Sequence, residues 1–179
     1  DKTVLITGGT GSFGKTICRH FLNQKDIKLK IFSRDEEKQD KMRQDFSDKR
    51  LSFHIGDVRD FDSIYEACYK VDYVFHAAAL KQEPSCEFYP IEAVKTNVLG
   101  TENLIKASIA QDIKKVVLLS TDKAVYPINS MGLTKSLMEK IMLSKSLLFR
   151  KCKTILCATR YGNVTVSYTH LTLPTNDVV

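Results

Sequence analysis

The chain has 179 residues, 43% of them hydrophobic and 27% charged, which indicates one globular domain without an apolar run long enough to span a membrane. Its formal net charge of +6 is spread among many acids and no aromatic platform accompanies it, so it fits a small anionic ligand or a solvated surface and is weak evidence for nucleic acid. Five cysteines without a C-x-x-C pair indicate reduced thiols in the cytoplasm, and they predict neither a disulfide framework nor a metal site.

Apolar strands and amphipathic helices alternate along the chain. The predicted strands lie near residues 4–7, 28–32, 51–55, 73–76, 116–120 and 154–159. The predicted helices lie near residues 12–24, 36–46, 61–68, 91–111 and 131–149. This βαβ alternation predicts an α/β fold of the Rossmann type, a doubly wound parallel sheet with helices on both faces. Right-handed crossovers then place the carboxyl ends of the strands at one edge of the sheet, where ligands bind.

A glycine-rich turn follows the first predicted strand. Gly8 permits a tight turn, Gly11 lets the backbone approach a pyrophosphate, and Gly14 allows close packing of helix against strand. A helix that begins near Ser12 would direct free N–H groups and the positive end of its dipole at the phosphates. The turn therefore predicts a nucleotide site, and its predicted cofactor-binding residues are Gly8, Thr10, Gly11, Ser12, Phe13 and Gly14.

The same turn matches a second pattern, because residues 9–16 also fit the G-x-x-x-x-G-K-[ST] of P-loop NTPases. That class needs an acidic residue at the end of a later apolar strand to hold Mg²⁺. After the apolar run 116–119, two residues intervene before Asp122, so the acid comes late. A dinucleotide site instead needs ribose-binding residues about 20 residues beyond the glycines, where Ser33-Arg34-Asp35 stands. Dinucleotide binding is therefore favoured.

Several sequence blocks resemble the extended short-chain dehydrogenase/reductase family. They are GGTGSFG, IFSRDEEKQ, IGDVRD, VFHAAALKQEPSCEFYP, TNVLGTENL, STDKAVYPINSMGLTK and TRYGNV, and they extend from the start of the chain to Val164. Within that family, they are similar to the UDP-N-acetylglucosamine 4,6-dehydratases (inverting, 5-epimerising) of capsule, O-antigen and flagellin sugar biosynthesis. The resemblance implies a cytoplasmic, NADP-dependent lyase that acts on a UDP-sugar. It also implies a homo-oligomer in which the two long helices form a four-helix contact.

The predicted cofactor preference rests on the end of the second strand. Arg34 supplies a guanidinium where an NAD enzyme places an acid for the ribose diol. With Ser33 and Lys38 it suits a 2′-phosphate, and so NADP rather than NAD. The alternative is that Arg34 only pairs with Glu37 or a nearby acid on the helix surface.

Other predicted cofactor contacts follow the third and fourth strands. Asp57 and Val58 resemble the family's adenine contact, although Asp57 equally suits a helix N-cap. The small residues Ala77, Ala78 and Ala79 would let a flat cofactor lie against the backbone. His76 is expected to be a core histidine rather than a catalyst.

The predicted substrate-binding residues are Lys81, Glu83 and Asn163. The first two lie where the family approaches its sugar nucleotide, and Lys81 could neutralise a phosphate. Asn163 resembles the superfamily's asparagine that holds the substrate diphosphate. Thr96 and Asn97 are expected to make structural polar contacts near the site.

The segment Ser120-Thr121-Asp122-Lys123 follows the fifth predicted strand, where the superfamily carries its serine or threonine and the dehydratases carry Asp-Lys. A 4,6-dehydration oxidises C4 of the sugar, eliminates water across C5–C6 and returns a hydride to C6. The C4 ketone makes the C5 proton acidic, so Lys123 could be the base. Asp122, kept protonated by an apolar setting, could protonate the departing C6 hydroxyl. A turn with two solvated charges is the alternative.

The superfamily's Tyr-x-x-x-Lys is replaced here by Met131-x-x-x-Lys135. The spacing puts both side chains on one helix face, so Lys135 can still bind the nicotinamide ribose. Methionine cannot ionise, and this argues against a plain UDP-sugar 4-epimerase; Tyr126 and Tyr161 are candidate replacements. The predicted catalytic residues are therefore Thr121, Asp122, Lys123, Met131 and Lys135.

Two segments are predicted. Residues 1–165 form an NAD(P)-binding Rossmann domain whose C-terminal substrate part is missing, and residues 166–179 form a non-native tail. The decapeptide VSYTHLTLPT resembles the translation of a transposon-end adapter used in DNA library preparation, which is why the tail is set apart.

The predicted function is that of an NADP-dependent UDP-N-acetylglucosamine 4,6-dehydratase, and the 179 residues alone are expected to be inactive. Two alternatives stay open. A UDP-sugar 4-epimerase would give a product of the same mass as its substrate, because no water is eliminated. A non-catalytic dinucleotide-binding module is favoured by Met131.

Overall fold

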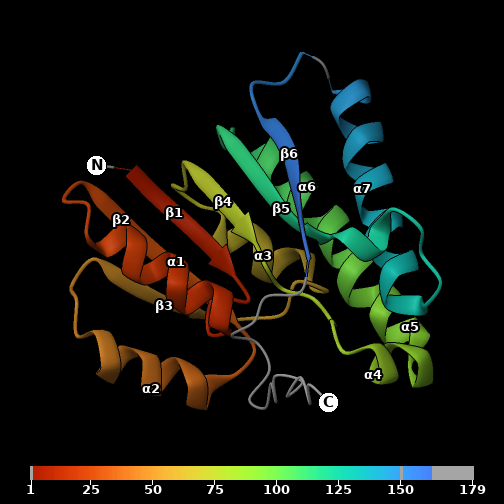
Figure 1. Ribbon diagram of the computed structural model, residues 1–179. Helices are drawn as coiled ribbons and strands as arrows, with labels where there is room; N and C mark the ends of the chain where they lie inside the picture. The colour runs from red at the N-terminus through yellow and green to blue at the C-terminus, as the bar shows by residue number, and fades with distance from the viewer. Residues whose placement is uncertain (1, 150, 163–179) are drawn as a thin grey trace, which may run out of the picture.

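The computed structural model describes residues 2–149 and 151–162, which form a six-stranded parallel sheet between two layers of helices (Figure 1). The strands are β1 Lys2–Thr7, β2 Ile27–Ser33, β3 Leu51–Ile55, β4 Tyr73–His76, β5 Lys115–Thr121 and β6 Ile155–Tyr161. Their order in the sheet is β3-β2-β1-β4-β5-β6, and every neighbouring pair is parallel. This is the strand order of the dinucleotide-binding Rossmann fold, so the predicted fold class is confirmed.

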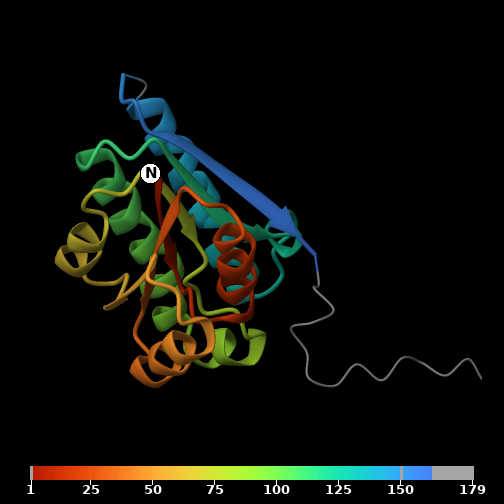
Figure 2. The same cartoon turned by 90° about the vertical axis from the view of Figure 1, so that its left-hand side faces the viewer.

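The helices divide between the two faces of the sheet (Figures 1 and 2). They are α1 Ser12–Leu22, α2 Glu36–Phe46, α3 Phe61–Ala67, α4 Glu83–Phe88, α5 Pro90–Ala93, α6 Gly100–Ala110 and α7 Ser130–Leu148, with a π-helical segment η1 Val94–Leu99 and a 3₁₀ turn η2 Asp122–Ala124. Alternate residues of β1 pack against the two helix layers, because successive side chains in a strand point to opposite faces of the sheet. Val4 and Ile6 pack with α1 and α2, and Leu5 packs with α3, α6 and α7.

Side-chain caps fix where several helices begin. Asp35 accepts from the Lys38 amide (2.9 Å) at the start of α2, and Asn129 accepts from the Gly132 amide (2.8 Å) at the start of α7. Asp60 caps α3. The alternative interpretation of Asp57 as the cap of this helix is therefore wrong, because α3 begins later in the chain.

The chain between β4 and β5 differs from the prediction. The predicted helix at 91–111 is observed as one helical run made of α5, η1 and α6, with a π-helical segment in its middle, and α4 was not among the predicted helices. Asn97, fully buried in η1, donates to the Leu80 carbonyl (2.9 Å) and accepts from the Leu80 amide (2.8 Å). These contacts tie the end of β4 to the helical layer, as expected for a structural asparagine. The short α4 begins with a glutamate and a proline in its first turn, where proline is compatible with a helix.

His76 lies in the core, as predicted, at the end of β4. Its Nδ1 lies 2.7 Å from Thr7 Oγ1 and its Nε2 lies 3.1 Å from Thr101 Oγ1. Thr101 Oγ1 donates to the Asn97 carbonyl, so it must accept from the Nε2–H of a neutral imidazole. Burial lowers the pKa of His76 to about 3, and the charge of Lys135 acts in the same direction.

This buried histidine predicts a pH-dependent stability. The unfolded chain binds a proton on His76 near its ordinary value of 6.5, whereas the folded chain does not until about pH 3. The contribution of His76 to the free energy of unfolding is therefore complete above the unfolded pKa. It is lost by about 1.4 kcal/mol per pH unit as the pH falls from the unfolded pKa to the folded pKa. Urea unfolding at several pH values should show a shallower acid slope of the unfolding free energy for His76→Asn than for the unmutated chain, and an unchanged slope would contradict this account.

Candidate functional site

A cleft of about 340 Å³ opens at the carboxyl edge of the sheet, where the ends of β1, β2, β3 and β4 meet. Its lining contains most of the residues predicted to bind a cofactor. Those residues are Gly8, Thr10, Gly11, Ser12, Phe13, Ser33, Arg34, Lys38, Asp57, Val58, Ala77, Ala78 and Ala79. Lys81, predicted to bind substrate, also lines the cleft. Gly14 and Lys135 do not lie in its wall.

The glycine turn brings the backbone close to the cleft. Gly8 has φ of +65°, and a Cβ there would lie 2.7 Å from the Ala78 nitrogen. A Cβ at Gly14 would lie 2.1 Å from the Gly9 carbonyl oxygen, so Gly14 acts by packing α1 against the turn rather than by touching a ligand. Gly11 is the N-cap of α1 and supplies no side-chain cap, which leaves the first-turn amides available to an anion.

The P-loop interpretation does not fit this arrangement. Lys15 and Thr16 do not line the cleft, and the Thr16 hydroxyl donates to the Ser12 carbonyl (3.0 Å) of its own helix. The cleft therefore fits a dinucleotide better than a magnesium nucleotide.

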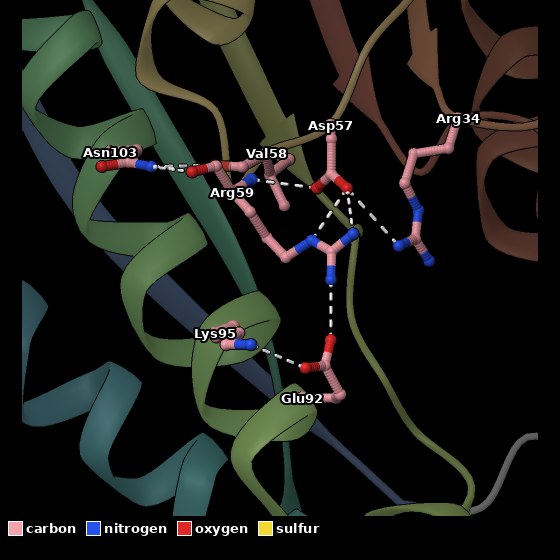
Figure 3. Close-up of polar contacts among 7 residues, drawn as sticks. All are labelled: Arg34, Asp57, Val58, Arg59, Glu92, Lys95 and Asn103. Carbon is pink, nitrogen blue, oxygen red and sulfur yellow. Dashed lines mark hydrogen bonds and ion pairs between the residues drawn. The ribbon is translucent and has the colours of Figure 1, made fainter. Parts of the chain in front are cut away.

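Charged side chains gather where the predicted 2′-phosphate would bind (Figure 3). Arg34 Nη1 lies 3.5 Å from Asp57 Oδ2, so the alternative pairing of Arg34 with Glu37 is not observed. Asp57 is held more closely by Arg59, whose Nε and Nη2 lie 2.8 and 2.6 Å from the same oxygen. Burial would raise the pKa of Asp57, but the bonds from Arg59 outweigh it and hold the pKa below its ordinary value. Lys38 Nζ pairs with Asp35 (2.6 Å).

The segment after β5 forms a polar turn beside α4. Thr121 Oγ1 donates to Asp122 Oδ1 (2.9 Å), and that oxygen also accepts from the Lys123 amide (2.8 Å). Lys123 Nζ forms an ion pair with Glu83, so the structure brings together residues predicted as a base and as a substrate contact. Asp122 is exposed, and the described part of the chain does not give it the apolar setting that was expected.

Lys135 is buried in α7 and does not line the cleft. Its Nζ donates to the Leu119 carbonyl (2.7 Å), and burial lowers its pKa to about 8 although the charge of Glu139 opposes the shift. Met131, also buried, packs against Cys86 and Ala93. The two side chains share one face of α7, as the spacing predicted, but neither lines the cleft.

Some functional residues were missed by sequence reasoning. Phe32 and Gly56 line the cleft at the ends of β2 and β3, whose register has no signal in one sequence, whereas Asp35 belongs to the predicted ribose-binding stretch. Glu139 was missed as well: it accepts from Ser120 and from Arg160 (2.6 Å) in a partly buried cluster near Lys135. Thr96 and Tyr161 line the cleft too.

Two predictions fall outside what the structure describes. Asn163 and the segment 166–179 both lie beyond residue 162. Among the described residues, no helix is long and apolar enough to cross a membrane.

The chain is similar in sequence to curated proteins that act on nucleotide sugars by name. The UDP-glucose 4-epimerase of Rickettsia akari is 58% identical over 171 residues, which cover 93% of this chain and 50% of that protein. The chain spans about half the length of the curated relatives that it matches.

Solved structures show the same fold. Pen from Bacillus thuringiensis matches with a TM-score of 0.92 and 42% identity, over 96% of this chain and 53% of that one. The dTDP-glucose 4,6-dehydratase DesIV from Streptomyces venezuelae, solved with NAD bound, matches with a TM-score of 0.78 and 20% identity, over 88% of this chain and 53% of that one. The model of one family covers residues 4–171. The chain belongs to the polysaccharide biosynthesis protein family.

Proposed function

We propose that this chain is the cofactor-binding part of an NADP-dependent UDP-N-acetylglucosamine 4,6-dehydratase that inverts C5. The observation that carries the proposal is the position of Asp122 and Lys123, at the end of β5 and beside the edge of the sheet where the cleft opens. The cleft would hold the dinucleotide, and the turn after β5 would act on the sugar.

The residues present fit the cofactor. The uncapped amides of α1 suit a pyrophosphate, and Arg34 with Ser33 and Lys38 suits a 2′-phosphate. Lys135 Nζ contacts the Leu119 carbonyl near the end of β5, and we assign it to the nicotinamide ribose on the resemblance of Met131-x-x-x-Lys135 to the superfamily's motif. When bound, NADP supplies the hydride acceptor for C4 and the hydride donor for C6.

The chain's own groups would carry the proton steps. Once C4 is a ketone, Lys123 removes the C5 proton and Asp122 protonates the C6 hydroxyl, which leaves as water. Lys123 is paired with Glu83 as an ammonium, so it can act as a base only after sugar binding separates the pair and the ammonium loses a proton to solvent. Asp122 is exposed in this chain, and a bound sugar would be the surface that desolvates it.

A UDP-sugar 4-epimerase is the second candidate, because the curated relatives at 57–58% identity carry that name. Both reactions begin with oxidation at C4, in which the hydride goes to the nicotinamide and the 4-hydroxyl proton must go to a group other than Met131, which cannot accept it. An epimerase must also return a proton to the C4 oxygen, a task for which the superfamily uses the tyrosine that Met131 replaces. The buried, non-ionisable Met131 therefore favours dehydration.

The cofactor part of the proposal predicts a preference for NADP. Arg34→Ala should weaken NADP binding by about 1.5–3 kcal/mol, the scale of a hydrogen bond to a charged group, and should leave NAD binding nearly unchanged. Calorimetric titration of both cofactors measures this directly. Equal affinities in the unmutated chain would contradict the assignment of NADP.

The reaction itself is tested by incubating UDP-N-acetylglucosamine with a chain extended to the length of the curated relatives. Mass spectrometry should find a product lighter by one water. A product of unchanged mass with inverted C4 would favour the epimerase instead.

A further inference from the structure

Arg59 is the centre of a charged network that the proposed reaction does not use (Figure 3). It lies between β3 and α3, two residues after Asp57, and its guanidinium lies between Asp57, which lines the cleft, and Glu92 of α5. On one side it donates from Nε and Nη2 to Asp57, and its own amide donates to Asp57 Oδ1 (2.9 Å). On the other side Nη1 lies 2.7 Å from Glu92, which also pairs with Lys95 (2.8 Å).

The backbone of this loop is fixed as well as its side chains. Asn103 of α6 donates from Nδ2 to the Val58 carbonyl (3.1 Å) and to the Arg59 carbonyl (3.0 Å). Arg59 is thus held at its backbone by Asn103 of α6 and at its guanidinium by Glu92 of α5. This places a cation against Asp57 before any ligand arrives.

The contacts of Asp57 are unequal. Arg59 makes two short side-chain contacts and one backbone contact with the carboxylate, whereas Arg34 only reaches 3.5 Å. Arg34 is 55% exposed at its side chain, compared with 36% for Arg59. The carboxylate is therefore largely neutralised by Arg59, and most of the donors of Arg34 stay directed to solvent in the cleft.

We propose that Arg59 is a positioning residue for cofactor specificity: by holding Asp57, it leaves Arg34 available to the 2′-phosphate of the dinucleotide. Without Arg59, the Asp57 carboxylate would draw Arg34 into a closer pair. It would also add an uncompensated negative charge beside the site of a doubly charged phosphate. Both effects penalise a 2′-phosphate and neither penalises a ribose diol.

This inference rests on the proposed preference for NADP, and its test separates the two. The probes are 2′,5′-ADP and 5′-AMP, which carry the adenosine end with and without the 2′-phosphate. Their affinity ratio cancels any contact with adenine, including one from Asp57. Calorimetry on the 179-residue chain gives the ratio without turnover.

Arg59→Ala should lower the affinity ratio about fivefold, the scale of a partly exposed charge interaction. Asp57→Asn should raise it, because the repelling charge is removed while Arg59 stays. The double variant should return close to the unmutated ratio. Lys95→Ala is the matched control: it removes a cation of the same network that contacts Glu92 rather than Asp57, and the ratio should not change.

Circular dichroism and thermal unfolding establish that each variant is folded. If Arg59→Ala does not fold, the test rests on Asp57→Asn, for which the affinity ratio is expected to rise. The inference is overturned if Arg59→Ala weakens both probes equally, or if Asp57→Asn lowers the ratio. If the unmutated chain binds both probes equally, the proposal of NADP fails and this inference fails with it. If the unmutated ratio is high and Arg59→Ala preserves it, only the inference fails.

Discussion

Lys123→Ala is expected to stop elimination while C4 oxidation remains possible, in a chain extended to the length of the curated relatives. The loss of one positioned base costs typically about 10²–10⁴-fold in rate. A 4-keto sugar that keeps its C6 hydroxyl should therefore accumulate together with reduced cofactor, in an amount equal to the enzyme. Single-turnover absorbance of the reduced nicotinamide, combined with mass spectrometry of the sugar, measures both.

The matched variants separate the roles within the site. Asp122→Asn should slow the same elimination, since an amide cannot protonate the departing hydroxyl. Met131→Leu should be mild, because a buried methionine contributes packing and leucine conserves its volume. If Lys123→Ala also abolishes cofactor reduction, Lys123 belongs to the C4 oxidation step and the division of roles is wrong.

Gly14→Ala is expected to destabilise the fold and, through it, the cofactor site. The new methyl group would lie 2.1 Å from the Gly9 carbonyl oxygen and 2.4 Å from two further Gly9 backbone atoms, so α1 must move away from the turn. Such overpacking costs about 1–3 kcal/mol or more and exceeds the gain of roughly 1 kcal/mol in helix propensity. Thermal unfolding should show a clear loss of Tm, and cofactor binding should weaken with it.

Gly11→Ala is the control in the same turn. A Cβ at Gly11 meets only the Gly8 carbonyl oxygen, at 3.3 Å, and φ there is −73°. Stability should change by about 1 kcal/mol or less, while cofactor binding falls because the methyl group covers the approach to the amides. Equal loss of stability in the two variants would contradict the packing role of Gly14.

Local signals were sufficient to predict the sheet. Every strand was placed within about two residues, because the central strands are buried apolar runs and the edge strands β3 and β6 follow the same alternation of strand and helix. The π-helical segment η1 inside the helix predicted at 91–111 was not predicted. Its Asn97 contacts Leu80 in the loop after β4, and a contact between segments distant in the chain has no local signal.

The candidate site shows the same distinction. The glycines, Arg34 and the alanines after β4 were predicted because each follows a strand end that the sequence marks. The Lys123–Glu83 pair and the Arg59 network were not predicted, since they join loops and helices distant in the chain. The expected setting of Asp122 failed because burial depends on neighbours that a single sequence does not identify.

The reaction in D₂O is the measurement that tests the central claim most directly. UDP-N-acetylglucosamine would be incubated with the extended chain and NADP, and the product examined by mass spectrometry and proton NMR. Dehydration predicts a product that has lost one water and carries a solvent deuteron at C5, because the C5 proton leaves and is replaced from solvent. A C4 epimer with all of its oxygen and no deuterium at C5 would contradict it.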